Sequence, residues 1–323
     1  MKNIIGIVAG EPNSISSEII FKCWKLIKKN KFNDFIVIGS IKLLTAQQKK
    51  LGSNVPIYEI KRNFKLNDVK KSKLCVLNVD YEQKKPFDKI SVKSNKYIFS
   101  CFNIAINLIK NKKISGIINC PISKETLFIG KNYGVTEYFS KKLNEKDKEV
   151  MLIFNKKLSV APCTTHIPLK YVSKRINKGD IIKKVKTIND FYINKISKKP
   201  KIAVLGLNPH ANSSEDFSEE RRIIKPAIDQ LKKMKINVVG PVSPDTVFTN
   251  YKSKKINVIF GMYHDQVLTG FKALFKFKAI NVTLGLKFTR VSPDHGVASD
   301  IMGKNKANPE SLIESIKFLN YMK

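Results

Sequence analysis

The sequence predicts an α/β fold built on a parallel sheet with helices on its faces. Short apolar runs of strand length recur along the chain, and most are followed by a segment whose apolar residues have helical spacing. Such repeated strand–helix alternation is typical of parallel sheets. The length of 323 residues suits two packed domains or one large α/β unit.

The first half of the chain has the clearest alternation. Residues 4–8 are expected to form a buried strand that ends before Gly10-Glu-Pro, and residues 95–110 a helix, because Ile98, Phe102 and Ala105 fall on one face. The other expected strands of this half are residues 35–39, 55–59, 74–78 and 116–119, and its other helices are residues 14–29 and 41–51.

The second half opens with a predicted hairpin. Residues 149–155 and 158–162 are strand-like, and Asn155-Lys-Lys between them has turn character. The further expected strands are residues 202–207, 258–260 and 280–284, and the expected helices are residues 180–195, 218–234 and 309–321. The last of these helices begins with Pro309, and Asn308 before it is the expected cap.

The chain carries a formal net charge of +34, which raises the question of nucleic-acid binding. Only five of its 60 basic residues are arginine, and the lysines are scattered through almost every expected helix and turn. Surfaces that recognise nucleic acids favour arginine and interleaved aromatic residues. We therefore expect a solvated basic surface and no specific nucleic-acid partner.

The apolar runs also exclude a membrane protein. Each is far shorter than the roughly 20 residues of a membrane-spanning helix, and the first is expected to be a strand, not a targeting segment. The five cysteines include no CxxC pair and are expected to be reduced. These observations predict a cytoplasmic protein with no membrane partner.

Three of the four histidines follow strand-like runs. His166 comes after residues 158–162, His210 after residues 202–207 and His264 after residues 258–260. In an open parallel sheet, the loops beyond the carboxyl ends of the strands line the ligand crevice. Three imidazoles delivered there are predicted to bind a divalent metal and to leave coordination positions open for a substrate.

Charged residues in the same kind of position complete the candidate site. Lys272 and Arg290 could neutralise a phosphate or carboxylate group, while Asp245 and Asp265 could ligate the metal, orient a histidine or move a proton. A single polar cluster after a strand is typical of a turn or a helix cap, and capping is the alternative role of Asp265. The first strand is followed by no GxGxxG motif, so a Rossmann dinucleotide site is not expected.

The chain resembles the 4-hydroxythreonine-4-phosphate dehydrogenase family of pyridoxal phosphate biosynthesis over nearly its whole length. The stretches that carry the resemblance are Gly10-Glu-Pro, Asn119-Cys-Pro-Ile-Ser-Lys-Glu, Thr136-Glu, Thr164-Thr-His-Ile-Pro-Leu, Gly206-Leu-Asn-Pro-His-Ala, Gly261-Met-Tyr-His-Asp-Gln and Asn281-Val-Thr-Leu-Gly through Asp294-His-Gly. The run that begins at His295-Gly-Val-Ala-Ser-Asp-Ile is also similar to the isopropylmalate and isocitrate dehydrogenases.

The resemblance implies a two-domain fold of the isocitrate dehydrogenase type, with the active site in the interdomain cleft at a homodimer interface. We expect residues 1–125 with 286–323 to form the domain that carries the termini, and residues 126–285 to form the domain with the metal and dimer elements. The implied reaction is NAD- or NADP-dependent oxidation of a phosphorylated small-molecule substrate, followed by loss of CO2. One divalent ion per subunit (zinc, magnesium or cobalt) is implied as well.

Individual roles follow by matching the motifs position by position. The implied metal ligands, shared between subunits, are His166, His210 and His264; the implied substrate-binding residues are Thr136, Lys272, Asn281 and Arg290; and the implied cofactor-binding residues are Asp294, His295 and Gly296. Asp245 and Asp265, chosen above for their residue type and position, are the candidate acid–base residues.

Three departures from the family pattern bear on substrate choice. Val135 stands where the family has a substrate-contacting histidine, and the loops at residues 13–17 and 212–217 lack the family's glycines. Lys131 is the nearest upstream lysine that could supply the missing charge. Two alternatives therefore stay open: the same chemistry on phosphothreonate or phosphoerythronate, and a basic binding protein without turnover.

Overall fold

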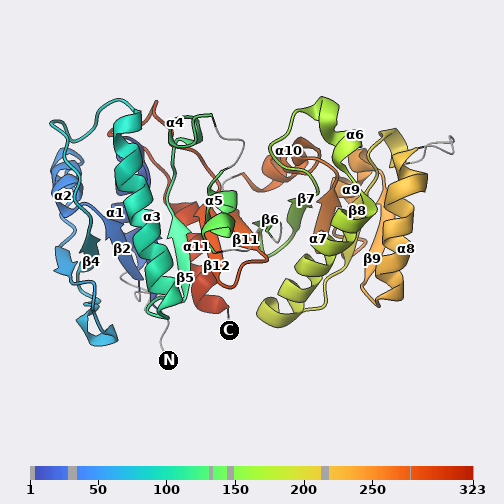
Figure 1. Ribbon diagram of the computed structural model, residues 1–323, viewed down its shortest axis with the longest axis horizontal. Helices are drawn as coiled ribbons and strands as arrows, with labels where there is room; N and C mark the ends of the chain where they lie inside the picture. Colours follow the sequence, from blue (N-terminus) through green and yellow to red (C-terminus); the bar gives the residue numbers. More distant parts are fainter. Residues whose placement is uncertain are drawn as a thin grey trace. The chain divides into compact units, whose positions relative to one another are not determined.

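The computed structural model describes residues 4–27, 35–130, 134–143, 149–211, 218–276 and 278–322, so Lys131 and the loop at residues 212–217 lie outside the described residues. The chain forms two compact units, Met1–Lys146 with Leu286–Tyr321 and Asp147–Gly285 with Met322–Lys323 (Figure 1). The chain passes from one unit to the other at residues 146/147 and 285/286. The boundaries expected from the sequence were 125/126 and 285/286.

The segment that separates these two boundaries contains α5 (Val135–Lys142). Its apolar side chains belong to the core of the first unit: the Phe139 ring lies 5.1 Å from the Phe102 ring and the Tyr138 ring 5.8 Å from it, centroid to centroid. This aromatic packing ties α5 to the first unit, and single-residue periodicity could not reveal such a contact.

The first unit contains a parallel sheet with the strand order β3-β4-β2-β1-β5-β12. The strands are β1 (Ile5–Val8), β2 (Phe35–Gly39), β3 (Ile57–Ile60), β4 (Leu74–Asn78), β5 (Gly116–Asn119) and β12 (Thr289–Pro293). Its helices include α1 (Ser16–Ile27), α2 (Ile41–Lys50), α3 (Asn95–Lys110), α4 (Lys124–Leu127) and α11 (Glu310–Tyr321). Strand β12 was not expected from the sequence, because its alternating Arg290 and Ser292 conceal its buried position.

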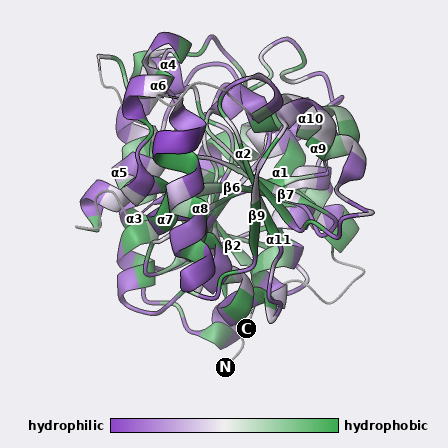
Figure 2. Ribbon diagram, turned by 90° about the vertical axis from the view of Figure 1, so that its right-hand side faces the viewer, coloured by the Kyte–Doolittle hydropathy of each residue, from purple (hydrophilic) through white to green (hydrophobic). Residues whose placement is uncertain are grey.

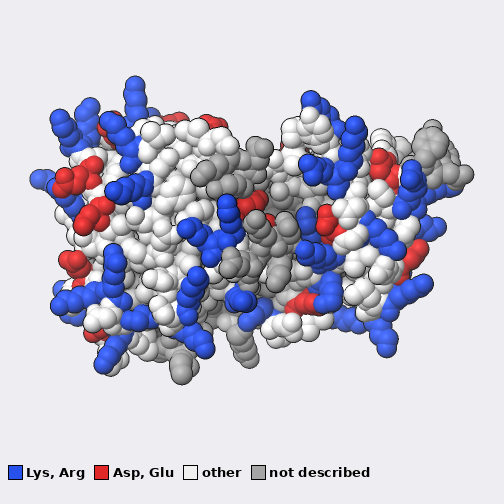
Figure 3. All heavy atoms as spheres, in the orientation of Figure 1, with Lys and Arg blue, Asp and Glu red and all other residues white. Residues whose placement is uncertain are grey.

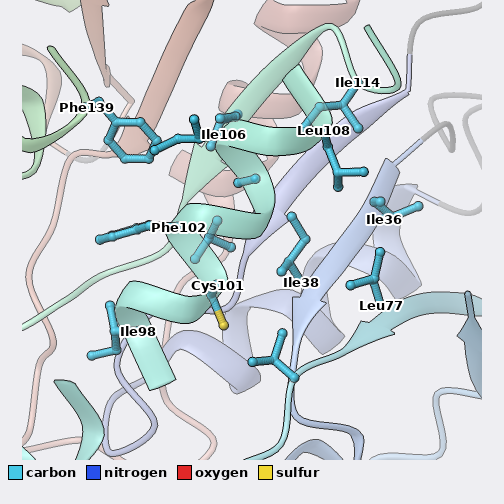
Figure 4. Close-up of a cluster of buried hydrophobic side chains, with 14 of the residues drawn as sticks. Ile36, Ile38, Leu77, Ile98, Cys101, Phe102, Ile106, Leu108, Ile114 and Phe139 are labelled. Atoms are coloured by element: carbon cyan, nitrogen blue, oxygen red, sulfur yellow. The ribbon is translucent and has the colours of Figure 1, made fainter. Parts of the chain in front are cut away.

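Helix α3 covers one face of this sheet, and α1, α2 and α11 lie on the other (Figure 1). Phe102 and Cys101 of α3 are fully buried against Ile36, Ile38 and Leu77 of the strands (Figure 4). Alternate strand residues point to opposite faces, so the buried side chains of Phe35 and Val37 face the helix layer on the other side of the sheet. The predicted helix at residues 95–110 is thus confirmed together with its apolar face.

The second unit contains a mixed sheet with the order β11-β6-β7-β10-β8-β9. Its strands are β6 (Val150–Phe154), β7 (Ser159–Pro162), β8 (Ile202–Leu205), β9 (Val238–Val242), β10 (Val258–Gly261) and β11 (Ile280–Leu284). Strands β7, β10, β8 and β9 are parallel, whereas β6 runs antiparallel to both β7 and β11. The predicted hairpin is therefore confirmed as β6 and β7.

Helices cover both faces of this second sheet. They are α6 (Val172–Arg175), α7 (Lys178–Phe191), α8 (Lys225–Lys233), α9 (Pro244–Asn250) and α10 (His264–Phe275), with π-helical turns at Tyr192–Ile196 and Glu220–Ile224. Helices α7 and α8 pack together on one face, and α9 and α10 on the other (Figure 1). Helix α7 begins where the Asn177 side chain accepts a hydrogen bond from the Asp180 N–H, a common N-cap arrangement.

Polarity is distributed as expected for such a fold. The strands are mainly hydrophobic and the helices carry mixed faces (Figure 2). Lysine and arginine side chains are dispersed over the face shown in Figure 3 and do not gather in one patch. Within the described residues, no helix has the length and apolar content needed to cross a membrane. All five cysteines are buried free thiols.

Candidate functional site

The three histidines of the second unit follow three neighbouring strands. Parallel strands β7, β10 and β8 lie side by side, and His166, His210 and His264 come just after the carboxyl ends of β7, β8 and β10, respectively. As the sequence predicted, the three histidines follow strands at the same edge of one sheet; His264 is the first residue of α10. The rings of His166 and His264 lie 5.9 Å apart, centroid to centroid.

Backbone contacts join the loops of this first histidine pair. The Cys163 N–H donates to the Gly261 carbonyl oxygen at 2.7 Å, and Thr164 donates to the Met262 carbonyl oxygen from its N–H at 3.1 Å and from Oγ1 at 2.8 Å. These bonds continue the pairing of β7 with β10 beyond the strands. They fix the chain on both sides, two residues before each imidazole.

Gln266 links the same region to the third histidine loop. Its Oε1 accepts a hydrogen bond from the Met262 N–H at 2.7 Å, and its Nε2 donates to the Gly206 carbonyl oxygen at 2.8 Å. Gly206 follows β8 and precedes the segment that carries His210. One side chain on α10 therefore holds two of the three loops in register.

The two candidate acid–base carboxylates each lie near a histidine. Asp265 Oδ1 is 2.6 Å from His264 Nδ1, an arrangement that would leave Nε2 of that ring for another ligand. The N-cap of α10 is Tyr263, and Asp265 lies in the first turn of the helix. A hydrogen bond from Ser243 lowers the pKa of Asp245, and the nearby His210 acts in the same direction.

Imidazole nitrogens and carboxylate oxygens are donors that zinc and cobalt accept, so the residue types fit a divalent ion. Within the described ranges, however, no three His, Cys, Asp or Glu side chains gather closely enough to form a metal site. His166 and His264 are paired, while His210 lies near Asp245. The three-histidine metal site remains a prediction.

Two predicted substrate residues belong to the second unit. Lys272 is exposed on α10, eight positions after His264, and Asn281 lies on β11. The Asn281 Oδ1 atom is buried and has no hydrogen-bond partner in the described part of the chain. Because a buried carbonyl oxygen without a donor is costly, this atom is a candidate contact for a ligand.

The other two predicted substrate residues meet in the first unit. The Arg290 side chain is buried, its Nε donates to Asn119 Oδ1 at 2.7 Å, and its Nη1 donates to Thr136 Oγ1 at 3.0 Å. Burial lowers the pKa of Arg290 to about 10, although the negative charge of Glu137 acts to raise it. At neutral pH the guanidinium is therefore a fixed cation held in a defined orientation.

Sequence reasoning assigned no role to Asn119 or Lys124, although both lie in a quoted motif. Asn119 ends β5 and orients the guanidinium of Arg290. Burial and the neighbouring charge of Arg290 lower the pKa of Lys124. Their position at or just after the end of a buried strand could have identified them, because the same position singled out the histidines.

The predicted cofactor residues lie just beyond β12. The Asp294 N–H donates to Ser311 Oγ at 2.9 Å, and His295 Nδ1 is 3.2 Å from the Gly296 carbonyl oxygen. A Cβ atom at Gly296 would meet no atom within 4 Å, so the backbone there is open. Cofactor binding by these residues stays a prediction.

Comparison with known proteins decides the family. The model of the pyridoxal phosphate biosynthetic protein PdxA matches residues 31–319. The chain belongs to the PdxA family. It is 40% identical to a 4-hydroxythreonine-4-phosphate dehydrogenase of Sulfurihydrogenibium sp., over 99% of this chain and 98% of the relative. It is also 32% identical to an Oceanobacillus iheyensis protein provisionally named D-threonate 4-phosphate dehydrogenase, over 98% and 96% of the two chains.

Solved structures agree with the PdxA assignment. A Salmonella typhimurium structure provisionally described as a 4-hydroxythreonine-4-phosphate dehydrogenase matches with a TM-score of 0.85 and 29% identity, over 99% of both chains. A β-decarboxylating dehydrogenase from Thermococcus kodakarensis matches with a TM-score of 0.53 and 10% identity, over 98% of this chain and 82% of that one. At 10% identity, this second likeness shows a shared fold alone.

Two of the three departures of this PdxA chain from the family pattern have structural explanations. Val135 is 4% exposed and belongs to the apolar core around Phe102, so its side chain is a packing element. In the loop at residues 10–18, which is described throughout, Gly10 alone has a positive φ, of 80°. Ser14 Oγ donates to the Glu11 carbonyl oxygen at 2.7 Å and closes that loop without further glycines.

Proposed function

We propose that this protein catalyses the NAD- and divalent-metal-dependent oxidation and decarboxylation of 4-phosphohydroxy-L-threonine to 3-amino-2-oxopropyl phosphate. The main support is the placement of His166, His210 and His264 just after the carboxyl ends of three adjacent parallel strands, in a chain that belongs to the PdxA family. The named activity of the 40%-identical relative supports the same substrate.

The residues of each unit have separate tasks in this proposal. Arg290 offers a fixed positive charge to an anionic group of the substrate, and Thr136 and Asn119 keep its guanidinium oriented. Lys272 supplies a second cation, and Asn281 offers a buried carbonyl oxygen to a hydroxyl or ammonium donor of the substrate.

The histidines would hold the ion, and Asp265 orients the His264 ring through Nδ1. When bound, a divalent ion supplies a Lewis acid for the reacting oxygen, and NAD or NADP accepts the hydride. Asp245, a carboxylate near His210, is the candidate acceptor for the hydroxyl proton.

We also propose a cytoplasmic homodimer. Ile167, Leu169 and Tyr171 directly follow His166 and are 36%, 67% and 46% exposed. Large apolar side chains in such a run favour burial by a partner, and a second copy would complete the metal site by the sharing that the family resemblance implies. The five free thiols support an intracellular location.

The direct test is to incubate the purified protein with 4-phosphohydroxythreonine, NAD and a series of divalent ions while NADH formation is followed. Metal-dependent NADH formation with release of 3-amino-2-oxopropyl phosphate is expected. Removal of the ion by a chelator should stop the reaction, and zinc, cobalt or magnesium should restore it.

A second candidate is the same chemistry on D-threonate 4-phosphate. The specific support is the 32%-identical relative of that name. A substrate panel separates the two: oxidation of phosphothreonate or phosphoerythronate in preference to 4-phosphohydroxythreonine would establish the second candidate. If no NADH forms with any of these substrates, the non-catalytic alternative is supported.

A further inference from the structure

Glu220 is a buried carboxylate that the proposed reaction does not use. It is 3% exposed and opens the π-helical turn before α8. Its Oε1 accepts hydrogen bonds from the N–H groups of Leu207 at 2.7 Å and Asn208 at 2.8 Å, and its Oε2 accepts from Asn208 Nδ2 at 2.8 Å. Burying a charge is costly unless donors of this kind compensate it.

Those donors belong to the loop that carries His210. The loop is unusual because His210 and Ala211 both have positive φ, of 60° and 52°. A residue with a side chain is strained in such a conformation, which persists only where its surroundings enforce it. The Ala211 N–H donates to the Asn208 carbonyl oxygen at 3.2 Å, so the strained turn closes directly onto the residue that Glu220 binds.

Gly206 makes the close approach feasible. A Cβ atom at this position would lie 2.6 Å from the Ala211 Cα and 3.1 Å from Glu220 Oε1. The absence of a side chain therefore allows the turn and the carboxylate to pack against the same stretch of backbone. Glycine, strained turn and buried acid form one compact arrangement around His210.

We propose that Glu220 is a positioning residue for His210: by fixing the Leu207 and Asn208 backbone, it holds His210 in the left-handed conformation in which its imidazole binds a divalent cation. The proposal rests on the proposed function, in which His210 is a cation ligand. It adds that the cation affinity of this site is set by a carboxylate that makes no contact with the ion.

Neighbouring Glu219 provides a matched control. Its Oε2 accepts a hydrogen bond from Asn208 Nδ2 at 2.9 Å, but within the described residues it contacts no backbone N–H of the loop. Glu219→Gln and Glu220→Gln remove the same charge from adjacent positions. A difference between them reports the hold on the backbone, because any general effect of charge on cation affinity is common to both.

The experiment is calorimetric titration of the metal-free protein with Zn²⁺ in the absence of substrate, with thermal denaturation as the check of folding. Glu220→Gln is expected to weaken Zn²⁺ binding about 10- to 100-fold, the usual range for a residue that orients a ligand, and Glu219→Gln by less than about threefold. With Co²⁺, the visible absorption spectrum should change in Glu220→Gln and stay as in the wild type in Glu219→Gln.

The outcomes separate the two proposals. If the wild type does not bind Zn²⁺ tightly, or His210→Ala binds it as well as the wild type, the ligand assignment is wrong. If His210→Ala loses binding while folded Glu220→Gln and Glu220→Asp both retain wild-type affinity, or Glu219→Gln is weakened equally, the positioning role is wrong. Should Glu220→Gln not fold, Glu220→Asp decides, because its shorter side chain keeps the charge but cannot reach the N–H groups of Leu207 and Asn208 in the same way. A loss of affinity beyond threefold then supports the role, and unchanged affinity overturns it.

Discussion

The Arg290 group of the first unit and the histidine group of the second hold their functional side chains in opposite ways. Arg290 is buried, and two side chains fix its guanidinium directly. His166 and His210 are exposed on loops, and hydrogen bonds to the backbone around them restrain the loops. Under the proposed function, the charge that would recognise an anion is built into the core, whereas the nitrogens that would bind the metal ion are left accessible.

The strongest test of this contrast is replacement of each histidine by alanine. Because these side chains lie outside the core, His166→Ala, His210→Ala and His264→Ala should fold normally. We expect each to weaken metal binding by more than about 100-fold, since loss of a ligand exceeds loss of an orienting residue, and to reduce turnover to background. Calorimetry and NADH formation measure both effects, and full activity of a metal-free His210→Ala protein would contradict the assignment.

Replacement of Arg290 should combine a functional loss with a structural one. Arg290→Ala is expected to lower kcat/KM about 10- to 150-fold, the worth of a charge-assisted contact of about 1.5–3 kcal/mol. It should also lower the melting temperature, because it leaves the buried Asn119 Oδ1 without its donor. Arg290→Lys should be nearly as damaging, since lysine cannot reproduce the two-pronged geometry.

Arg62→Ala is the control for that change, because it removes an exposed arginine and the same charge. Its kcat/KM and melting temperature should match the wild type. Unchanged kcat/KM in Arg290→Ala would rule out substrate binding by Arg290, and an unchanged melting temperature would contradict the structural half of the contrast.

A smaller effect is expected at Thr136. Thr136→Val keeps the shape of the side chain but removes the oxygen that accepts from Arg290 Nη1. Loss of this hydrogen bond, worth about 1 kcal/mol, should leave Arg290 less well oriented and lower kcat/KM about fivefold. Thr136→Ser restores the hydroxyl and should recover most of the activity. Equal kcat/KM values for Thr136→Val and Thr136→Ser would show that the hydroxyl does not hold Arg290.

The smallest effect on catalysis is expected at Val135. An imidazole at this buried apolar position should destabilise the fold by about 1–3 kcal/mol, the cost of burying a polar group without a partner. Val135→His should therefore melt at a lower temperature while the folded protein keeps its substrate preference. A shift of preference in the substrate panel, without loss of stability, would instead place residue 135 in the substrate pocket.

The sequence was sufficient for the features that depend on local pattern. Apolar runs and helical spacing located most strands and helices, and the position of the histidines after three such runs predicted their common edge. Strands β9 and β12 were missed because Gly240-Pro241 and Arg290 interrupt their apolar pattern. The pairing of Arg290 with Asn119 joins residues 171 positions apart, a distance at which a single sequence carries no local signal.

The interior thiols give this chain a built-in reporter of its own opening. Burial raises the pKa of Cys163 to about 11 and that of Cys101 to about 12, and it raises the pKa of Cys23, Cys75 and Cys120 as well. The reactive thiolate is therefore scarce in the native state at neutral pH, and alkylating reagents can reach these sulfurs only after the chain opens. Because the thiols lie in both units, the rate at which each is alkylated would measure how often each unit unfolds, without any introduced label.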